Sequence, residues 1–177
     1  MSSPLELVRK SLSPADGDIE HAVLHHFVIG GGCLGPPVPI EELSGWLGFQ
    51  IVLLSGMEDD FSGIVSLRDR LIGINAHHHP RRRRFSIAHE LGHVVLAHPP
   101  EHRITLEASR RLDREANRCA AELLMPLGLL MPHLARRLSL VQLATIFAVS
   151  EQAMVHRLKS LSVPGVLPQS VFHSRRG

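Results

Sequence analysis

Residues 84–98 read RFSIAHELGHVVLAH, and this stretch decides the fold. Apolar and His residues recur in it at helical spacing, so we predict an amphipathic helix from Phe85 to His98, ended by the Pro-Pro pair that follows. The residues expected on one side of this helix are Phe85, Ala88, His89, Gly92, His93 and Leu96. Gly92 would also let another segment approach the helix closely.

The same helix contains the pattern HExxH, formed by His89, Glu90 and His93. The four-residue spacing puts both imidazoles on one face, about one turn apart, where they can hold a single ion. Zn²⁺ lowers the pKa of a bound water to about 7, so a neighbouring Glu can take its proton and deliver hydroxide to a peptide carbonyl. We therefore predict a zinc site with His89 and His93 as ligands and Glu90 as the general base.

A catalytic zinc site normally has three protein ligands and one open position. The metzincin pattern is excluded, because it needs Gly and His where the chain has Leu96 and Pro99. On an ideal helix His98 points about 180° away from His89, nine residues before it, so His98 is not expected to be a ligand.

The third ligand is expected from a helix over about residues 106–124, which includes RLDREANRCAAELL. At about 100° per residue, its predicted buried face is formed by Leu112, Ala116, Ala120, Leu123 and Leu124. Asp113 and Asn117 lie on that face or at its edge, so we predict Asp113 as the third ligand and Asn117 as a group that orients a ligand. The alternative for Asp113 is an ordinary carboxylate near a helix start. Glu115 and Glu122 are expected on a solvated face.

The rest of the chain predicts a single α+β domain. We expect helices over 18–29, 39–48 and 127–138, and about three short strands before residue 76, two of them in a hairpin turning near Arg68 and Asp69. A last helix pair is expected over 139–161. The domain is assigned to 18–162, between a loosely ordered arm over 1–17 and a tail over 163–177.

Composition excludes several classes of protein. Nineteen basic and seventeen acidic residues leave a formal charge of +2, far from the imbalance of a protein that coats nucleic acid. Cys33 and Cys119 have no metal-binding spacing and make a poor disulfide framework, which favours a reducing compartment. There is no signal-peptide pattern and no apolar run of about 18 residues, so we expect a cytoplasmic protein without membrane contact.

Two other stretches suggest nucleic-acid contact. Arg81 to Arg84 follow three His, His77 to His79, and could bind phosphate, although a solvated loop before the metal-binding helix is favoured. The three His are expected at the surface rather than in a second metal site. Residues 142–161 have the outline of a helix-turn-helix, but the second helix offers only a mixed set of base-contacting groups. Packing within the domain is therefore favoured over DNA binding.

Taken with the block DREANRCAAELLMP over 113–126, the HExxH block resembles the ImmA/IrrE family of metallopeptidases. The resemblance extends upstream to PPVPIEELSGWLG and to the strand pair ending LIGIN, and downstream through VSEQAMVHRLKSL, so that it covers roughly residues 19–161. It implies a compact zincin-like domain with a small three-stranded sheet packed on the active-site helix and a C-terminal helical bundle. The family's Arg-Phe dipeptide suggests that Arg84 anchors a carboxylate near the site.

In that family the third ligand is usually the first Glu of a Glu-x-Glu-Ala-Asn segment, and Asp113 stands at this position here. The shorter carboxylate implies that the helix sits closer to the ion, or that Glu115 or a water substitutes. The resemblance further implies a zinc-dependent endopeptidase whose substrate is a helix-turn-helix repressor, expected to be encoded beside it. Two alternatives stay open: a DNA-binding regulator with a structural or vestigial zinc site, and a module that sequesters its repressor without cutting it.

Overall fold

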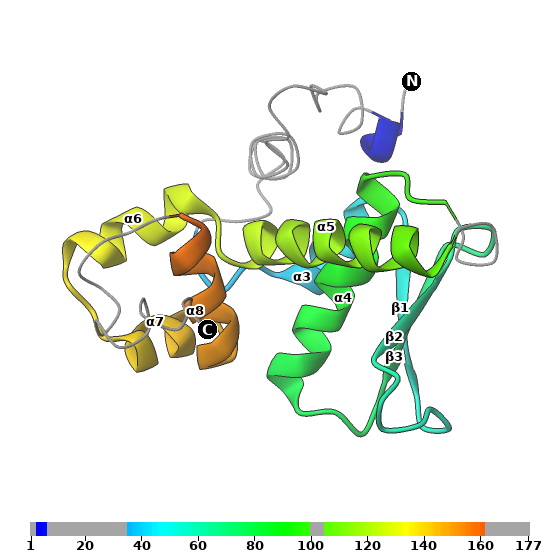
Figure 1. Cartoon of the computed structure of the whole chain (residues 1–177), viewed down its shortest axis with the longest axis horizontal. Coiled ribbons are helices and arrows are strands. Elements are labelled where there is room, and N and C mark those ends of the chain that lie inside the picture. The colour runs from blue at the N-terminus through cyan, green and yellow to red at the C-terminus, as the bar shows by residue number, and fades with distance from the viewer. Residues whose placement is uncertain (1–2, 7–34, 100–104, 162–177) are drawn as a thin grey trace.

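The computed structural model of the chain describes residues 3–6, 35–99 and 105–161 (Figure 1). The helix predicted over 18–29 and the tail over 163–177 lie outside the described residues, as does most of the arm over 1–17. Within the described part, no helix is long and apolar enough to span a membrane.

Three short strands form a mixed sheet: β1 (Gln50–Leu54), β2 (Gly63–Ser66) and β3 (Leu71–Asn75). β3 lies in the middle, parallel to β1 and antiparallel to β2. Ile72 and Ile74 of β3 are fully buried, because their face of the sheet packs against helices. The predicted three strands and the predicted hairpin between the last two are confirmed.

The hairpin turn is stabilised by a local hydrogen-bond pair. The Ser66 hydroxyl donates to the Asp69 carboxylate over 2.7 Å, and the Asp69 backbone N–H donates back to the hydroxyl over 3.3 Å. Arg70 then adopts a left-handed φ of 56° and leads into β3. Polar residues that bond their own backbone are typical of such turns.

Two helices cover the inner face of the sheet. α3 (Ile40–Trp46) contacts β1, and α4 (Pro80–Val95) contacts β2 and β3. α4 also packs along α5 (Leu106–Leu124), and this is the most extensive helix pair of the described fold. In Figure 1, α5 crosses in front of α4 and runs from the side of the sheet toward the remaining helices.

Those remaining helices form the C-terminal bundle: α6 (Leu127–Ala135), α7 (Leu140–Ile146) and α8 (Glu151–Ser160). α7 packs on α8, and α8 reaches back to α5. The fold is therefore α+β, with a three-stranded sheet, a central helix and a helical bundle, which confirms the predicted fold class.

Several predicted boundaries need correction. α4 begins at Pro80, so Arg81 to Arg84 form its first turns and are not a loop before it. It also ends at Val95, before His98. Pro80 stands at the first helical position, which its fixed φ favours, and His79 caps the helix through Nδ1, which accepts from the Arg81 N–H over 3.2 Å. α6 ends three residues earlier than expected, at Ala135.

Candidate metal centre

Gly92 brings the two helices of the centre unusually close together. A Cβ at this position would lie 3.0 Å from the Ala116 carbonyl oxygen and 3.1 Å from its Cα, both backbone atoms of α5. Ala116 and Cys119 on the facing side are fully buried. The close approach expected at Gly92 is therefore present, and α5 is the segment that makes it.

Three potential ligand atoms converge where these helices meet. The Nε2 atoms of His89 and His93 lie 3.1 Å apart, and His93 Nε2 lies 3.6 Å from an Asp113 carboxylate oxygen. All three donor atoms fall within 4.8 Å of one another. Tetrahedral zinc with bonds of about 2.05 Å would separate its ligands by about 3.3 Å. The residues present thus fit a zinc ion in number and donor type, and the separations of 3.1 and 3.6 Å are close to this value.

Asn117, one turn after Asp113 on α5, contacts the outer side of His89. The His89 Nδ1–H donates to the Asn117 amide oxygen over 3.0 Å. This bond leaves Nε2 as the lone-pair nitrogen, directed toward His93. A second partner of this kind fixes the tautomer and ring orientation of a ligand.

His98 lies against His93, contrary to the prediction that it points the opposite way. After α4 ends, the Ala97 N–H donates to the Val94 carbonyl and the His98 N–H donates to the His93 carbonyl. These two bonds, with a left-handed φ of 55° at Ala97, form a Schellman motif. The motif folds the chain back, so that His98 Nδ1 lies 3.0 Å from His93 Nδ1.

The carboxylate of Glu115 lies on the far side of His98, where its Oε2 is 3.3 Å from Nε2 of that ring. Its other oxygen is 3.5 Å from Nε of Arg111, one turn earlier on α5. Glu115 is half-exposed, as expected, yet it contacts the histidine cluster. Glu122 differs from the prediction: it is mostly buried and lies 3.7 Å from the buried Arg157 guanidinium.

The environment keeps the imidazoles of the centre neutral. Burial lowers the pKa of His89, and burial together with the neighbouring His89 and His98 lowers the pKa of His93 to about 4. Burial also lowers the pKa of His98, against the opposing effect of Glu115. Only a neutral imidazole has a lone pair to donate to a metal, so the centre is prepared for a cation at neutral pH.

Glu90 points toward the edge strand β2. Its Oε1 lies 3.0 Å from the place where a Cβ on Gly63 would stand. The missing side chain at Gly63 therefore makes room for this carboxylate. The sequence contains a signal for this contact, because Gly in a predicted strand often marks a close approach by another group. The identity of the approaching group depends on tertiary structure and could not be predicted.

Two of the three His before α4 connect the loop that precedes it to the segment between β1 and β2. His77 and His78 each place Nε2 within 2.9 Å of a backbone carbonyl, on Ser55 and Asp59 respectively. His78 is buried, which corrects the expectation of a surface residue, while His77 and His79 are exposed. Arg84 does anchor a carboxylate, but this is Glu41 of α3, at 3.6 Å, together with the Val38 carbonyl at 2.7 Å.

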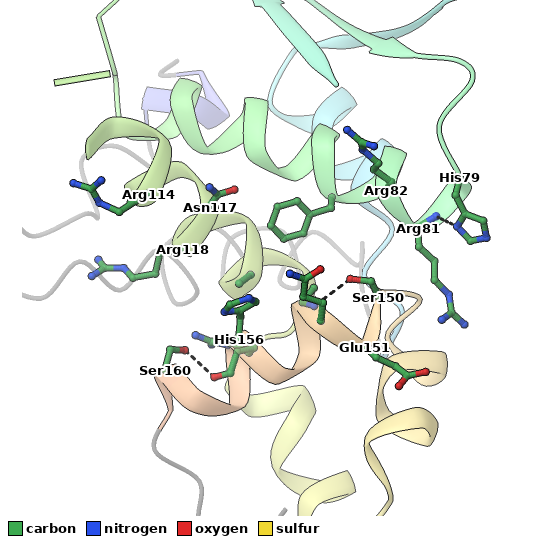
Figure 2. Close-up of a pocket in the computed structure, with 15 residues that line it drawn as sticks. His79, Arg81, Arg82, Arg114, Asn117, Arg118, Ser150, Glu151, His156 and Ser160 are labelled. Atoms are coloured by element: carbon green, nitrogen blue, oxygen red, sulfur yellow. Dashed lines mark hydrogen bonds between the residues drawn. The ribbon is translucent and has the colours of Figure 1, made fainter. Parts of the chain in front are cut away.

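A groove of about 1080 Å³ lies beside the centre, between α4, α5 and α8 (Figure 2). Asn117 lines it as well as contacting His89, so the groove begins at the metal centre. Figure 2 shows Arg114 and Arg118 on one side of it, Arg81 on the other, and His156 of α8 between them. The sequence pattern did not reveal this groove, because it joins three helices from distant parts of the chain.

A small sheet packed on a helix that carries HExxH, with a carboxylate from a second helix, defines a metallopeptidase-like domain. The chain belongs to the Peptidase_M78 family, whose model is described as the IrrE N-terminal-like domain and matches residues 47–159. The resemblance stated from the sequence is thereby confirmed.

The fold is also similar to a solved structure of a Mycobacterium tuberculosis transcriptional regulator. The TM-score is 0.64 at 20% sequence identity, and the match covers 93% of this chain and 54% of that one. This chain therefore spans about half the length of that regulator. No curated protein sequence matches the chain significantly.

Proposed function

We propose that the protein is a zinc-dependent endopeptidase that hydrolyses a peptide bond in a protein partner. The observation that carries this proposal is the convergence of His89 Nε2, His93 Nε2 and an Asp113 oxygen within 4.8 Å, beside Glu90. Three protein ligands leave a fourth position open, as catalytic zinc requires and structural zinc does not.

Asp113 is supported as the third ligand by the packing of α4 on α5. The contact at Gly92 and Ala116 brings the helices close enough for a short carboxylate to lie 3.6 Å from His93 Nε2. Glu115 instead lies beside His98. The first of the implied alternatives, a helix that sits closer to the ion, is thus the one we propose.

Zinc, when bound, would polarise the peptide carbonyl and lower the pKa of a coordinated water. Glu90 would accept the proton of the attacking water on its carboxylate and pass it to the amine nitrogen as the C–N bond breaks. Asn117 would hold His89 with its Nε2 lone pair toward the ion. The absence of a side chain at Gly63 would leave room for the Glu90 carboxylate during both transfers.

We propose that the partner is a helix-turn-helix repressor encoded by a neighbouring gene, and that the two proteins interact in the cytoplasm. The support is membership of the IrrE-like family together with the resemblance to peptidases that act on such repressors. The similar fold of a protein described as a transcriptional regulator is consistent with a partner that controls transcription.

Direct DNA binding is the less supported alternative. In a helix-turn-helix the second helix must project into a groove of DNA, and here that helix is α8. Gln152 and His156 of α8 line the groove against α4 and α5, and Arg157 is buried with its Nε–H donating to the Met125 carbonyl over 3.0 Å. Arg157 is therefore not available for contact with DNA, and Gln152 and His156 line the groove that begins at the metal centre.

The test compares wild type with Glu90→Gln. A peptidase should bind about one zinc per chain in both forms, cleave the neighbouring repressor in wild type, and lose cleavage by several orders of magnitude in the variant. His89→Ala should lose the metal. Wild-type protein that carries stoichiometric zinc and binds the repressor without cutting it would overturn the enzyme proposal in favour of sequestration.

A further inference from the structure

We propose that the groove between α4, α5 and α8 binds an acidic segment of a polypeptide. This inference rests on the proposed function and names the chemistry of the substrate beside the scissile bond. The groove is defined by its lining residues His79, Arg81, Arg82, Phe85, Arg114, Asn117, Arg118, Ala121, Ser150, Glu151, Gln152, Ala153, His156, Arg157 and Ser160.

The groove continues directly from the metal centre. Phe85 precedes His89 by one helical turn on α4, and Asn117 follows Asp113 by one turn on α5, so each pair shares a helix face. Both Phe85 and Asn117 line the groove. A chain that crosses the metal centre can therefore extend along the same two helices into the groove.

The charge of the groove is strongly positive. Its lining includes five arginines and one acidic residue, Glu151. Arg118 and Arg157 share Glu122, at 3.6 and 3.7 Å. Among the described residues, Arg81 and Arg114 have no ion-pair partner, and they stand on opposite sides of the groove in Figure 2. A chain lying between them would meet guanidinium groups from both sides, and these pair well with carboxylates.

The lining of the groove favours a polypeptide over nucleic acid. Phe85, Ala121 and Ala153 add apolar side chains to it, which suit an apolar side chain between two acidic residues. Glu151, on α8, would repel a continuous phosphate backbone, whereas the carboxylates of a peptide can be spaced so that none lies beside it. The whole chain, with a formal charge of +2, also lacks the general attraction for nucleic acid that a more basic protein has.

The binding test uses the full-length Glu90→Gln protein, so that cleavage is not needed for a signal. The probe is a fluorescein-labelled peptide of about ten residues, with glutamates on both sides of a central leucine, followed by fluorescence anisotropy. Binding should weaken as salt is raised, and Arg81→Glu/Arg114→Glu should weaken it at least about tenfold. Arg110→Glu/Arg136→Glu, at exposed sites outside the groove, is the matched control and should bind as before.

Three outcomes would overturn the proposal: equal binding by both double variants, equal binding of a lysine version of the peptide, or tighter binding of a duplex of about twenty base pairs that depends on Arg81 and Arg114. If charge reversal unfolds the protein, Arg81→Gln/Arg114→Gln provides the same comparison. Repressor cleavage without acidic-peptide binding would refute this inference alone, whereas peptide binding without cleavage by wild type would refute the proposed function alone.

A separate set of distances supports a second inference: His98 and Glu115 are positioning residues for His93. With His93 Nε2 directed to the ion, its Nδ1 carries the proton and can donate to His98 Nδ1 across 3.0 Å. His98 Nε2 then carries its own proton, and a Glu115 carboxylate oxygen lies 3.3 Å from it. The side chain of His98 is only 5% exposed, so water cannot easily take its place beside His93.

Zinc affinity, measured by competition with a chromophoric chelator, tests this second inference without any assay of activity. His98→Ala should weaken binding about 10- to 100-fold, and His98→Asn should recover part of the loss because its amide oxygen can still accept from His93 Nδ1. His77→Ala, at an exposed His outside the groove whose ring contacts the Ser55 carbonyl, is the control. Nitrogen NMR of the zinc-loaded protein should show the His93 proton on Nδ1.

Unchanged zinc affinity in His98→Ala, with the wild type binding zinc tightly, would refute the positioning role and leave the metal centre intact. Failure of the wild type itself to bind zinc would refute the metal centre. Equal losses in His98→Ala and His98→Asn, with the metal-free proteins equally stable, would also count against the role, since only the acceptor atom distinguishes these two variants.

Discussion

Gly63 controls the space beside Glu90, the proposed general base. A Cβ at this position would lie 3.0 Å from Glu90 Oε1, 3.2 Å from Glu90 Cγ and 3.1 Å from Ile74 Cδ1. These separations are shorter than ordinary van der Waals contact, so a side chain would have to displace one of the neighbours. Ile74 is fully buried, and the Glu90 carboxylate is the group with more freedom to move.

We therefore expect Gly63→Ala to lower kcat/KM by about tenfold or more while zinc content stays at the wild-type level. The measurement is repressor cleavage together with metal analysis of the same preparation. Gly56→Ala is the matched control, because a Cβ there meets nothing within 4 Å. A loss of zinc in Gly63→Ala, or equal activity in the two variants, would contradict this account of Glu90.

His93 gives the metal-free protein a pH-dependent stability. Its pKa is lowered to about 4 in the folded chain, from an ordinary value of 6.5. Between these values the unfolded chain binds a proton that the folded chain does not, so the free energy of unfolding falls as the pH falls. The stabilisation is fully present above about pH 6.5 and is lost progressively toward about pH 4.

Urea unfolding of the metal-free protein at about pH 7.5 and about pH 5 measures this effect. Wild type should lose more stability between these two conditions than His93→Ala, which lacks the titrating group. Parallel losses in both proteins would mean that His93 does not have the lowered pKa.

The single residues show where sequence reasoning succeeds and where it stops. His89, Glu90 and His93 follow one another at fixed helical spacing, so their relation could be predicted without tertiary information. The position of His98 could not be predicted in this way, because helical spacing applies only up to Val95, where α4 ends. The left-handed Ala97 reverses the chain there, and Ala, unlike Gly, gives no signal of such a turn.

At the scale of elements, the interface of α4 and α5 sets the geometry of the candidate metal centre. Two of the proposed ligands come from α4 and one from α5, so the distance between the helices decides whether Asp113 could reach an ion. That distance depends on Gly92, where the nearest facing atoms belong to the backbone of α5 and cannot rotate away.

Gly92→Ala should therefore push the helices apart, destabilise the protein by about 1–3 kcal/mol, and weaken zinc binding. Thermal unfolding of the metal-free protein and chelator competition measure the two effects. Gly45→Ala in α3, where a Cβ meets nothing within 4 Å, should not weaken zinc binding. A Gly92→Ala protein with wild-type zinc affinity would show that Asp113 does not limit the site.

Most elements of the fold could be predicted because local signals agree with tertiary packing. α5 was predicted with its bounds, and its predicted buried residues are buried, since a 19-residue amphipathic helix has one face to hide. The start of α4 was missed because four consecutive arginines obscure the apolar period. The His79-Pro80 pair was the available signal, as a cap followed by proline at the first helical position.

At the scale of the whole molecule, relations between distant segments escape sequence periodicity. The arginines of the groove come from α4 and α5, and its third wall comes from α8. The local sequence around each basic residue predicts only a solvent-exposed helix face. The charges come together only when the three helices pack. The same holds for Arg157, a basic residue in the second helix of the possible helix-turn-helix, which is buried against Glu122 and the Met125 carbonyl.

Zinc should also stabilise the whole fold, because its proposed ligands tie α4, which covers the sheet, to α5, which leads into the bundle. A ligand that binds only the folded state at a hundred times its dissociation constant adds about 2.7 kcal/mol. For a chain of this size that corresponds to a rise in Tm of about 5–10 °C. Calorimetry with and without zinc should show this rise in wild type and in Glu90→Gln, which keeps all three ligands. It should be absent in His89→Ala and in Asp113→Ala, and a full shift in Asp113→Ala, with loss only in Glu115→Ala, would transfer the third ligand from Asp113 to Glu115.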